Sequence, residues 1–164
     1  MGAVYHRLLR TGHAAALSRQ SGIADLSYRA VVELCAKDET RTLRIEGPVA
    51  NLGGRKRRMP TLRGMSPFDH RGHLIGLQFG GPDNRENLCP MHGRLNMVGA
   101  HSPWSTMEKT IVRMLGDGRG HMTVRLGYAA PDDLRPHRIH VQLQTLSHGV
   151  CVWQFMNFSP DLSR

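Results

Sequence analysis

Residues 66–97 read SPFDHRGHLIGLQFGGPDNRENLCPMHGRLNM and hold most of the unusual chemistry of the chain. An apolar stretch at 74–79 ends in Gly-Gly-Pro-Asp-Asn, which is a strong loop signal. Beyond the loop, Asn87 is a candidate cap for a helix whose first turn carries Pro90, with Asn96 two turns further along. The segment therefore predicts an extended stretch, a loop and a helix.

The same segment supplies an imidazole, amide oxygens and several guanidinium groups. An imidazole such as that of His73 can take a proton from water as the water attacks phosphorus. The side-chain oxygen of Asn96 is a hard, uncharged donor that suits Mg²⁺, which keeps most of its waters and needs few protein ligands. Each residue taken singly has an ordinary structural explanation, but together they are the groups that phosphodiester hydrolysis requires.

A helix is predicted from Ser102-Pro103 to about Leu115, because a hydroxyl at the N-cap and proline at the first position favour a helix start. At about 100° per residue, Glu108 falls inside the apolar stripe of this helix. Burying an ionised carboxylate without partners costs several kcal/mol, so Glu108 should face a cation, a metal-bound water or firm donors. A salt bridge to an arginine is the alternative. The apolar stripe consists of Trp104, Met107, Ile111, Met114 and Leu115.

Three patterns occur here in a fixed order: RGHLIG and QFGG within 71–81, NL and PM within 87–91 followed by LN at 95–96, and Trp104 four residues before Glu108. Together they resemble the DNA/RNA non-specific endonuclease family of ββα-metal (His-Me finger) nucleases, and most closely its branch of toxin domains in bacterial secreted effectors. The resemblance covers residues 69–108. It implies an α+β fold with a ββα-metal core at about residues 66–115.

The resemblance also implies roles for individual residues. His73 would be the general base and Asn96 a direct metal ligand. Glu108 would bind the metal through water, and Asn87 would support the metal site. Arg71 would contact the phosphate of the substrate.

Two departures from the family pattern are visible. His70 stands between Asp69 and Arg71, where the familiar pattern places aspartate directly before the arginine, so no metal role is transferred to Asp69. The interval between Asn96 and Glu108 is longer than is usual for the family, which makes the assignment of Glu108 the weaker of the two metal assignments.

The charge of the chain favours a polyanionic partner. Its 164 residues include 22 Lys and Arg against 13 Asp and Glu, a formal net charge of +9 at pH 7. Arg94 is a further candidate for phosphate contact, from its charge and position alone. A basic run within a predicted loop would follow the phosphate backbone, or else be a solvated charge run. This run consists of Arg55, Lys56, Arg57 and Arg58.

Alternating patterns predict an antiparallel C-terminal sheet. Residues 120–128 and 138–146 read as half-buried strands, and 150–158 reads as a third strand that pairs with the second as a hairpin. Residues 28–35 fit a strand or a helix, and 42–45 a short strand that stops at the following Gly-Pro turn signal.

Residues 1–40 are predicted as an N-terminal segment of uncertain structure, and residues 41–164 as the nuclease domain. Two alternatives are open for residues 1–25: a helix around Leu8, Leu9 and Leu17, or a leader. No continuous apolar run of a signal peptide is present, and no stretch approaches the roughly 20 apolar residues of a membrane-spanning helix, so we expect no membrane insertion. The three cysteines form no CxxC pair and are predicted as small buried hydrophobic residues rather than disulfide partners.

A competing interpretation uses some of the same residues. His70, His73, Cys89 and His92 have a spacing compatible with a structural zinc site, which would make the domain a non-catalytic, basic, nucleic-acid-binding module. A third hypothesis is a basic binding protein with a decayed nuclease core.

The family resemblance implies an Mg²⁺-dependent endonuclease, with Mn²⁺ as the alternative ion, that cleaves DNA and as a further candidate RNA, and leaves 5′-phosphate products. The toxin branch implies export by a specialised bacterial secretion system, action in the cytoplasm of a target cell, and an acidic immunity protein that protects the producer.

Overall fold

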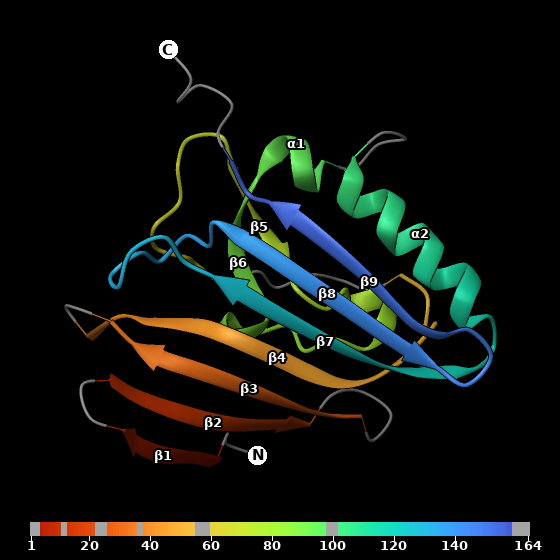
Figure 1. Cartoon of the computed structure of the whole chain (residues 1–164), viewed down its shortest axis with the longest axis horizontal. Coiled ribbons are helices and arrows are strands. Elements are labelled where there is room, and N and C mark those ends of the chain that lie inside the picture. Colours follow the sequence, from red (N-terminus) through yellow and green to blue (C-terminus); the bar gives the residue numbers. More distant parts are fainter. Residues whose placement is uncertain are drawn as a thin grey trace.

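The computed structural model describes residues 4–10, 13–21, 26–35, 38–54, 60–97 and 102–158, with side chains from residue 26 onward. Its main element is a seven-stranded sheet in the order β1-β2-β3-β4-β7-β8-β9, in which every neighbouring pair is antiparallel (Figure 1). The strands are β1 (Val4–Arg10), β2 (His13–Ser21), β3 (Ser27–Leu34), β4 (Thr40–Ala50), β7 (Arg119–Gly127), β8 (Arg138–Thr145) and β9 (Gly149–Met156).

Between β4 and β7 the chain leaves this sheet and covers one of its faces (Figure 1). Two short strands there form a separate antiparallel pair. The elements are β5 (Asp69–His73), the 3₁₀ turns η3 (Leu77–Phe79) and η4 (Arg85–Asn87), β6 (Leu88–His92), α1 (Gly93–Asn96) and α2 (Pro103–Leu115). The structure is thus mostly antiparallel sheet with few helices, which is compatible with a nuclease fold.

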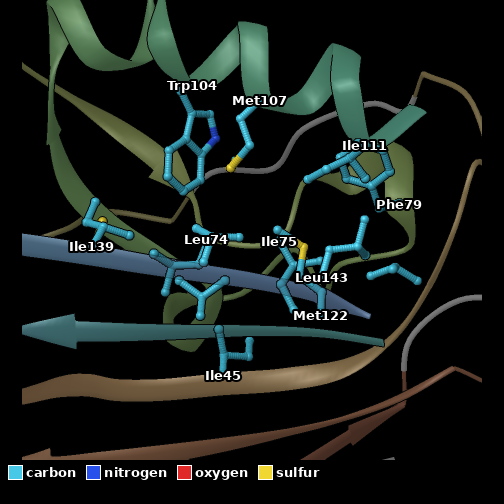
Figure 2. Close-up of a cluster of buried hydrophobic side chains, with 14 of the residues drawn as sticks. Ile45, Leu74, Ile75, Phe79, Trp104, Met107, Ile111, Met122, Ile139 and Leu143 are labelled. Atoms are coloured by element: carbon cyan, nitrogen blue, oxygen red, sulfur yellow. The ribbon is translucent and has the colours of Figure 1, made fainter. Parts of the chain in front are cut away.

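A single hydrophobic core joins the covering segment to the sheet (Figure 2). Alternate residues of the strands point into it, and residues one helical turn apart on α2 meet them from the other side. The Trp104 and Phe155 rings, from α2 and β9, lie 5.2 Å apart between centroids. Core members include Ile45, Met122, Ile139 and Leu143 from the sheet, Leu74, Ile75 and Phe79 from the covering segment, and Trp104, Met107 and Ile111 from α2.

Several local predictions are confirmed. Helix α2 begins after Ser102, whose side chain accepts a hydrogen bond from the Ser105 backbone N–H, and it ends before Gly116. The three C-terminal strands lie where their alternation places them, and β8 and β9 form the predicted hairpin. Residues 28–35, left open between strand and helix, lie largely in β3.

The predicted helix from Asn87 is wrong. Residues 88–92 form β6, which pairs with β5, and the helix that follows has only four residues, so Asn96 is the last residue of α1. Pro90 is tolerated in this strand because, among the described residues, β6 pairs only with β5 and forms no ladder along its other edge. All five residues of β6 are buried, so the strand shows no alternation that a sequence pattern could reveal.

Two further predictions are corrected. The apolar stretch 74–79 is not extended, because Phe79 and Gly80 donate backbone hydrogen bonds to Gly76 and Leu77 and close a 3₁₀ turn. Most side chains of this stretch are buried in the core, which explains its apolar composition without an extended backbone. Strand β4 does not stop at Gly47-Pro48 but runs to Ala50, since β7 continues to pair with it there.

The backbone of the N-terminal segment contributes strands, so a helix around Leu8, Leu9 and Leu17 is not what the structure has. The strands on either side of residue 40 pair in one sheet, and the division of the chain at that residue stays a prediction. No helix in the described part of the chain is long and apolar enough to cross a membrane. All three cysteines are free; Cys89 is buried, and Cys35 and Cys151 are half-buried.

Candidate active site

A cleft of about 800 Å³ lies between the covering strand β5, the turn that follows it, and the helices α1 and α2. It brings together four residues that the sequence singled out. Arg71 and His73 come from β5, Asn96 ends α1, and Glu108 lies one turn into α2. The cleft therefore has an imidazole and a guanidinium on one wall and an amide and a carboxylate on the other.

His73 contacts a carboxylate that the sequence analysis did not select. Its Nε2 atom lies 3.0 Å from Oδ1 of Asp83, and the His73 side chain is only 10% exposed. Asp83 belongs to the loop between η3 and η4, which the sequence marked only as a turn. Asp83 follows His73 by ten residues, and a carboxylate at that position in the predicted loop is the sequence signal that could have identified it.

Asn87 lies behind the cleft and is fully buried. Its side chain accepts a hydrogen bond from Ile75 N–H (2.9 Å) and donates to the carbonyls of Ile75 (2.7 Å) and Pro82 (2.8 Å). Its backbone N–H donates to Oδ1 of Asn84 at 3.1 Å. Asn87 thus shapes the loop beside His73 and does not line the cleft; its predicted supporting role remains a prediction.

The carboxylate of Glu108 lies against a glycine of the opposite wall. An ideal Cβ placed on Gly76 would come within 2.8 Å of Glu108 Oε1, so a side chain at that position would displace the carboxylate. The predicted apolar stripe is confirmed around it, because Trp104, Met107 and Ile111 are buried. Glu108 itself is half-buried at the edge of the cleft.

The two helices that carry Asn96 and Glu108 are joined by Ser102. Its hydroxyl donates to the Leu95 carbonyl at 2.9 Å and accepts from the Ser105 N–H at 3.1 Å. One buried side chain therefore fixes the end of α1 relative to the start of α2.

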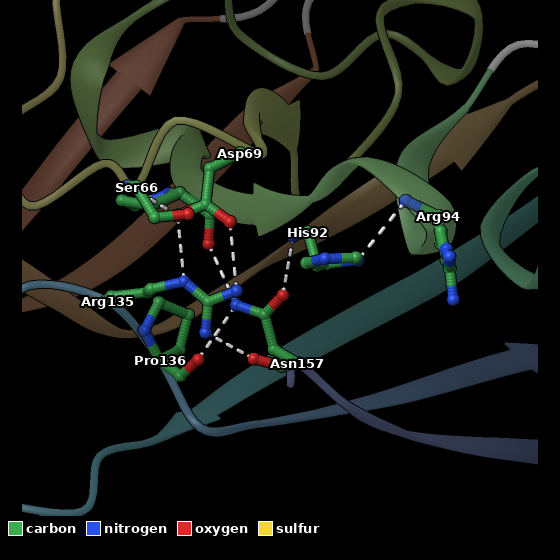
Figure 3. A network of polar contacts seen from close by, with 8 residues as sticks. Ser66, Asp69, His92, Arg94, Arg135, Pro136 and Asn157 are labelled. Atoms are coloured by element: carbon green, nitrogen blue, oxygen red, sulfur yellow. Dashed lines mark hydrogen bonds and ion pairs between the residues drawn. The ribbon is translucent and has the colours of Figure 1, made fainter. Parts of the chain in front are cut away.

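The start of β5 is anchored by an ion pair that spans 66 residues of sequence. Arg135, from the segment between β7 and β8, donates Nε to Oδ2 of Asp69 at 2.8 Å and Nη2 to Oδ1 at 2.9 Å (Figure 3). Burial alone would raise the pKa of Asp69, but hydrogen bonds from Arg135 and Ser66 outweigh it and hold that pKa below its ordinary value. Both oxygens of Asp69 are thus engaged by hydrogen bonds within the chain.

Asn157, which follows the last strand of the sheet, forms a second set of hydrogen bonds to the β5-β6 pair. The Asn157 side chain accepts a hydrogen bond from His92 N–H at 2.7 Å and donates one to the Pro136 carbonyl at 2.8 Å (Figure 3). Asn157 also donates to the Pro90 carbonyl at 2.9 Å. Its own carbonyl accepts from Arg135. Sequence reasoning missed both Arg135 and Asn157, because no local pattern marks a partner so distant along the chain.

One of the remaining predicted phosphate contacts lies away from the cleft, and the others fall outside the described residues. Arg94 is exposed on α1 and is not among the residues that line the cleft. The basic run Arg55, Lys56, Arg57 and Arg58 lies outside the described residues.

The geometry argues against the zinc interpretation. Alternation along the β5-β6 pair places His70 and Cys89 on one face and His73 and His92 on the other. His73 and His92 are also at opposite ends of the pair, about 13 Å apart along the strands. Burial raises the pKa of the Cys89 thiol, which disfavours the thiolate that zinc needs.

Comparison with protein families identifies the class of the protein. Residues 49–147 match the DNA/RNA non-specific endonuclease family, and they include the catalytic candidates of the cleft. The match spans more than half of the chain, and the protein belongs to this family. No curated protein matches the chain. Membership supports nuclease activity in general and a nucleic-acid substrate, and the family is in general metal-dependent.

Proposed function

We propose that this protein is a metal-dependent endonuclease that hydrolyses phosphodiester bonds of DNA, and of RNA as a second substrate, largely without regard to sequence. The observation that supports it is that four candidate residues line the same cleft: Arg71, His73, Asn96 and Glu108. The order strand, strand, helix of β5, β6 and α1 supports a ββα-metal core, with the histidine at the end of the first strand and the asparagine on the helix.

In the proposed reaction, His73 takes a proton from a water molecule as that water attacks phosphorus. Arg71, two residues away on β5, binds the phosphate through charge-assisted hydrogen bonds. The 3′-oxygen departs, so the products carry a 5′-phosphate. Arg94 and the basic run 55–58 would bind the phosphate backbone further from the scissile bond and add affinity without sequence preference.

The donors on the second wall fit a hard divalent cation. In the described part of the chain no three His, Cys, Asp or Glu side chains converge as a metal cluster. The cleft instead offers the amide oxygen of Asn96 and the carboxylate of Glu108, and a pair of oxygen ligands suits Mg²⁺, or Mn²⁺, because such an ion keeps several waters. When bound, the ion would neutralise charge on the phosphoryl oxygens and on the leaving oxygen.

The biological setting is proposed from the toxin branch that the sequence resembles. A bacterial secretion system would export the protein, and it would act in the cytoplasm of a target cell. The producing cell would then need an immunity protein, acidic on the face that covers this cleft, because the chain carries a net charge of +9.

The deciding experiment is digestion of plasmid DNA and of RNA with Mg²⁺, with EDTA, and with His73→Ala, run side by side. We expect cleavage with Mg²⁺, none with EDTA, and loss of cleavage by His73→Ala with binding retained in fluorescence anisotropy. His148→Ala, which alters an exposed histidine in the β8-β9 turn, is the matched control and should cleave normally.

Substantial Mg²⁺-dependent cleavage by His73→Ala would refute the assignment of the base. Salt-sensitive binding with no cleavage by the unaltered protein would favour the non-catalytic binding protein instead. In the same assay, Asn96→Ala should need more Mg²⁺ for half-maximal rate, and an unchanged metal titration would count against Asn96 as a ligand.

A further inference from the structure

We propose that Asp83 is a positioning residue that sets the tautomer and the basicity of His73, and that Asn87 holds Asp83 in place for this purpose. The inference rests on the proposed role of His73 as the base. Its foundation is the 3.0 Å contact between His73 Nε2 and Asp83 Oδ1, together with the hydrogen bonds that fix the loop on both sides of Asp83.

The chemistry of the contact determines which nitrogen can accept a proton. An ionised carboxylate only accepts hydrogen bonds, so His73 must donate its Nε2–H to Asp83. The neutral imidazole then carries its lone pair on Nδ1. When Nδ1 takes the proton of the attacking water, the imidazolium that forms is stabilised by the adjacent negative charge.

The loop holds Asp83 by its two neighbours in the chain. The carbonyl of Pro82 accepts a hydrogen bond from Asn87 Nδ2, and the side chain of Asn84 accepts one from Asn87 N–H. The residues on either side of Asp83 are therefore both bonded to one fully buried asparagine. This arrangement limits the movement of Asp83 before substrate binds, as a preorganised site requires.

The loop also presses closely against the turn after β5. An ideal Cβ on Gly81 would lie 2.0 Å from the carbonyl oxygen of Ile75, so no side chain fits there. The close approach is secured by Asn87, which bonds to both backbone groups of Ile75. Asp83 thus lies opposite His73 because of a fixed backbone path and not because of a chance surface rotamer.

Other charged groups share the cleft with His73 and must be considered in a pH profile. Among the described residues, the other titratable and charged side chains that line it are Asp69, His70, Arg71 and Glu108. Asp69 is engaged by Arg135. Asp83 makes a direct hydrogen bond to the imidazole, so we assign the control of its tautomer to Asp83.

The test compares Asp83→Asn with the unaltered protein by two readouts. The first is the ¹⁵N imidazole spectrum of metal-free protein, with the His73 signals assigned by their loss in His73→Ala. We expect the Nε2–H tautomer in the unaltered protein and a mixture of tautomers in Asp83→Asn, because an amide can either accept or donate.

The second readout is the pH dependence of cleavage. Loss of the carboxylate lowers the pKa of the imidazole, so the acidic limb of the kcat profile should move to lower pH. At the plateau, kcat should fall about 10- to 100-fold with KM nearly unchanged, by analogy with the loss of a hydrogen-bond partner from a metal-ligating histidine. Asp83→Glu, which keeps the charge, should recover part of kcat and return the limb towards its original pH.

Asp117→Asn, in the exposed turn before β7, is the matched control and should change neither readout. An Asp83→Asn protein that keeps the Nε2–H tautomer and the original pH limb overturns the inference, as does an Asp83→Glu protein no better than Asp83→Asn. The spectrum does not depend on turnover. A chain that shows the tautomer shift but never cleaves nucleic acid would therefore contradict the proposed function and leave the role of Asp83 in orienting His73 intact.

Discussion

The two walls of the cleft are held in place by different kinds of interaction. The wall that carries His73 consists of the short strand β5 and a loop whose path is fixed by the hydrogen bonds of Asn87. The opposite wall consists of helices, positioned by the cap at Ser102 and by the apolar face of α2 against the core. Because a buried polar clamp depends on a few directional bonds, losing one side chain should damage the first wall more than the second.

The largest effect is expected for Asn87→Ala. This change leaves the Ile75 N–H and two buried carbonyls without their partners, and each such group costs about 1–3 kcal/mol. We expect the free energy of unfolding to fall by about 3–5 kcal/mol, measured by urea denaturation. Asn84→Ala, which removes one half-buried bond in the same loop, should cost about 1 kcal/mol and serves as control. Equal losses of unfolding free energy for the two variants would contradict the conclusion that the hydrogen bonds of Asn87 hold this loop in place.

A smaller effect is expected for Asp69→Asn at the other end of β5. Breaking its buried pair with Arg135 should cost about 2–4 kcal/mol at pH 7. Because the folded-state pKa of Asp69 is depressed, its stabilising effect is present above the unfolded-state pKa of about 3.9 and is lost as pH falls through the lower folded-state pKa.

The stability difference between Asp69→Asn and the unaltered protein should therefore shrink when unfolding midpoints are measured at pH 3 instead of pH 7. Asp133→Asn, in the segment between β7 and β8, tests whether the effect is specific to the buried pair. A gap that stays constant with pH would exclude the ion pair as its cause.

The smallest effect is expected on the helical wall. Ser102→Ala removes the cap of α2 and the bond to the Leu95 carbonyl, and should cost about 1–2 kcal/mol in thermal or urea unfolding. Apolar packing still holds α2, so the variant should fold and should chiefly need more Mg²⁺, because Asn96 and Glu108 lose their fixed relation. Ser147→Ala, in an exposed turn, should alter neither property. A loss as large as that of Asn87→Ala would remove the contrast between the walls.

The sequence predicted helix α2 and the C-terminal sheet well because their signals are local. Ser102, Pro103 and the stripe around Met107 report on one helix, and alternation reports on each strand by itself. Strand β6 was misread because its residues are all buried and its partner lies across a long loop. The four residues that line the cleft could be selected because they belong to a sequence motif: Arg71, His73, Asn96 and Glu108. Asp83, Arg135 and Asn157 could not, because their contacts join segments that are brought together only in the folded chain.

Asn157 has a practical consequence for how much of the chain a working nuclease needs. It follows β9 and lies beyond residue 147, where the match to the family ends. Yet its fully buried side chain joins β6 to the turn before β8 by hydrogen bonds, and its backbone carbonyl accepts a hydrogen bond from Arg135, the partner of Asp69. A fragment trimmed to the matched segment would lose these contacts and strand β9 together, so we expect a fragment that folds and cleaves by itself to extend at least to residue 157.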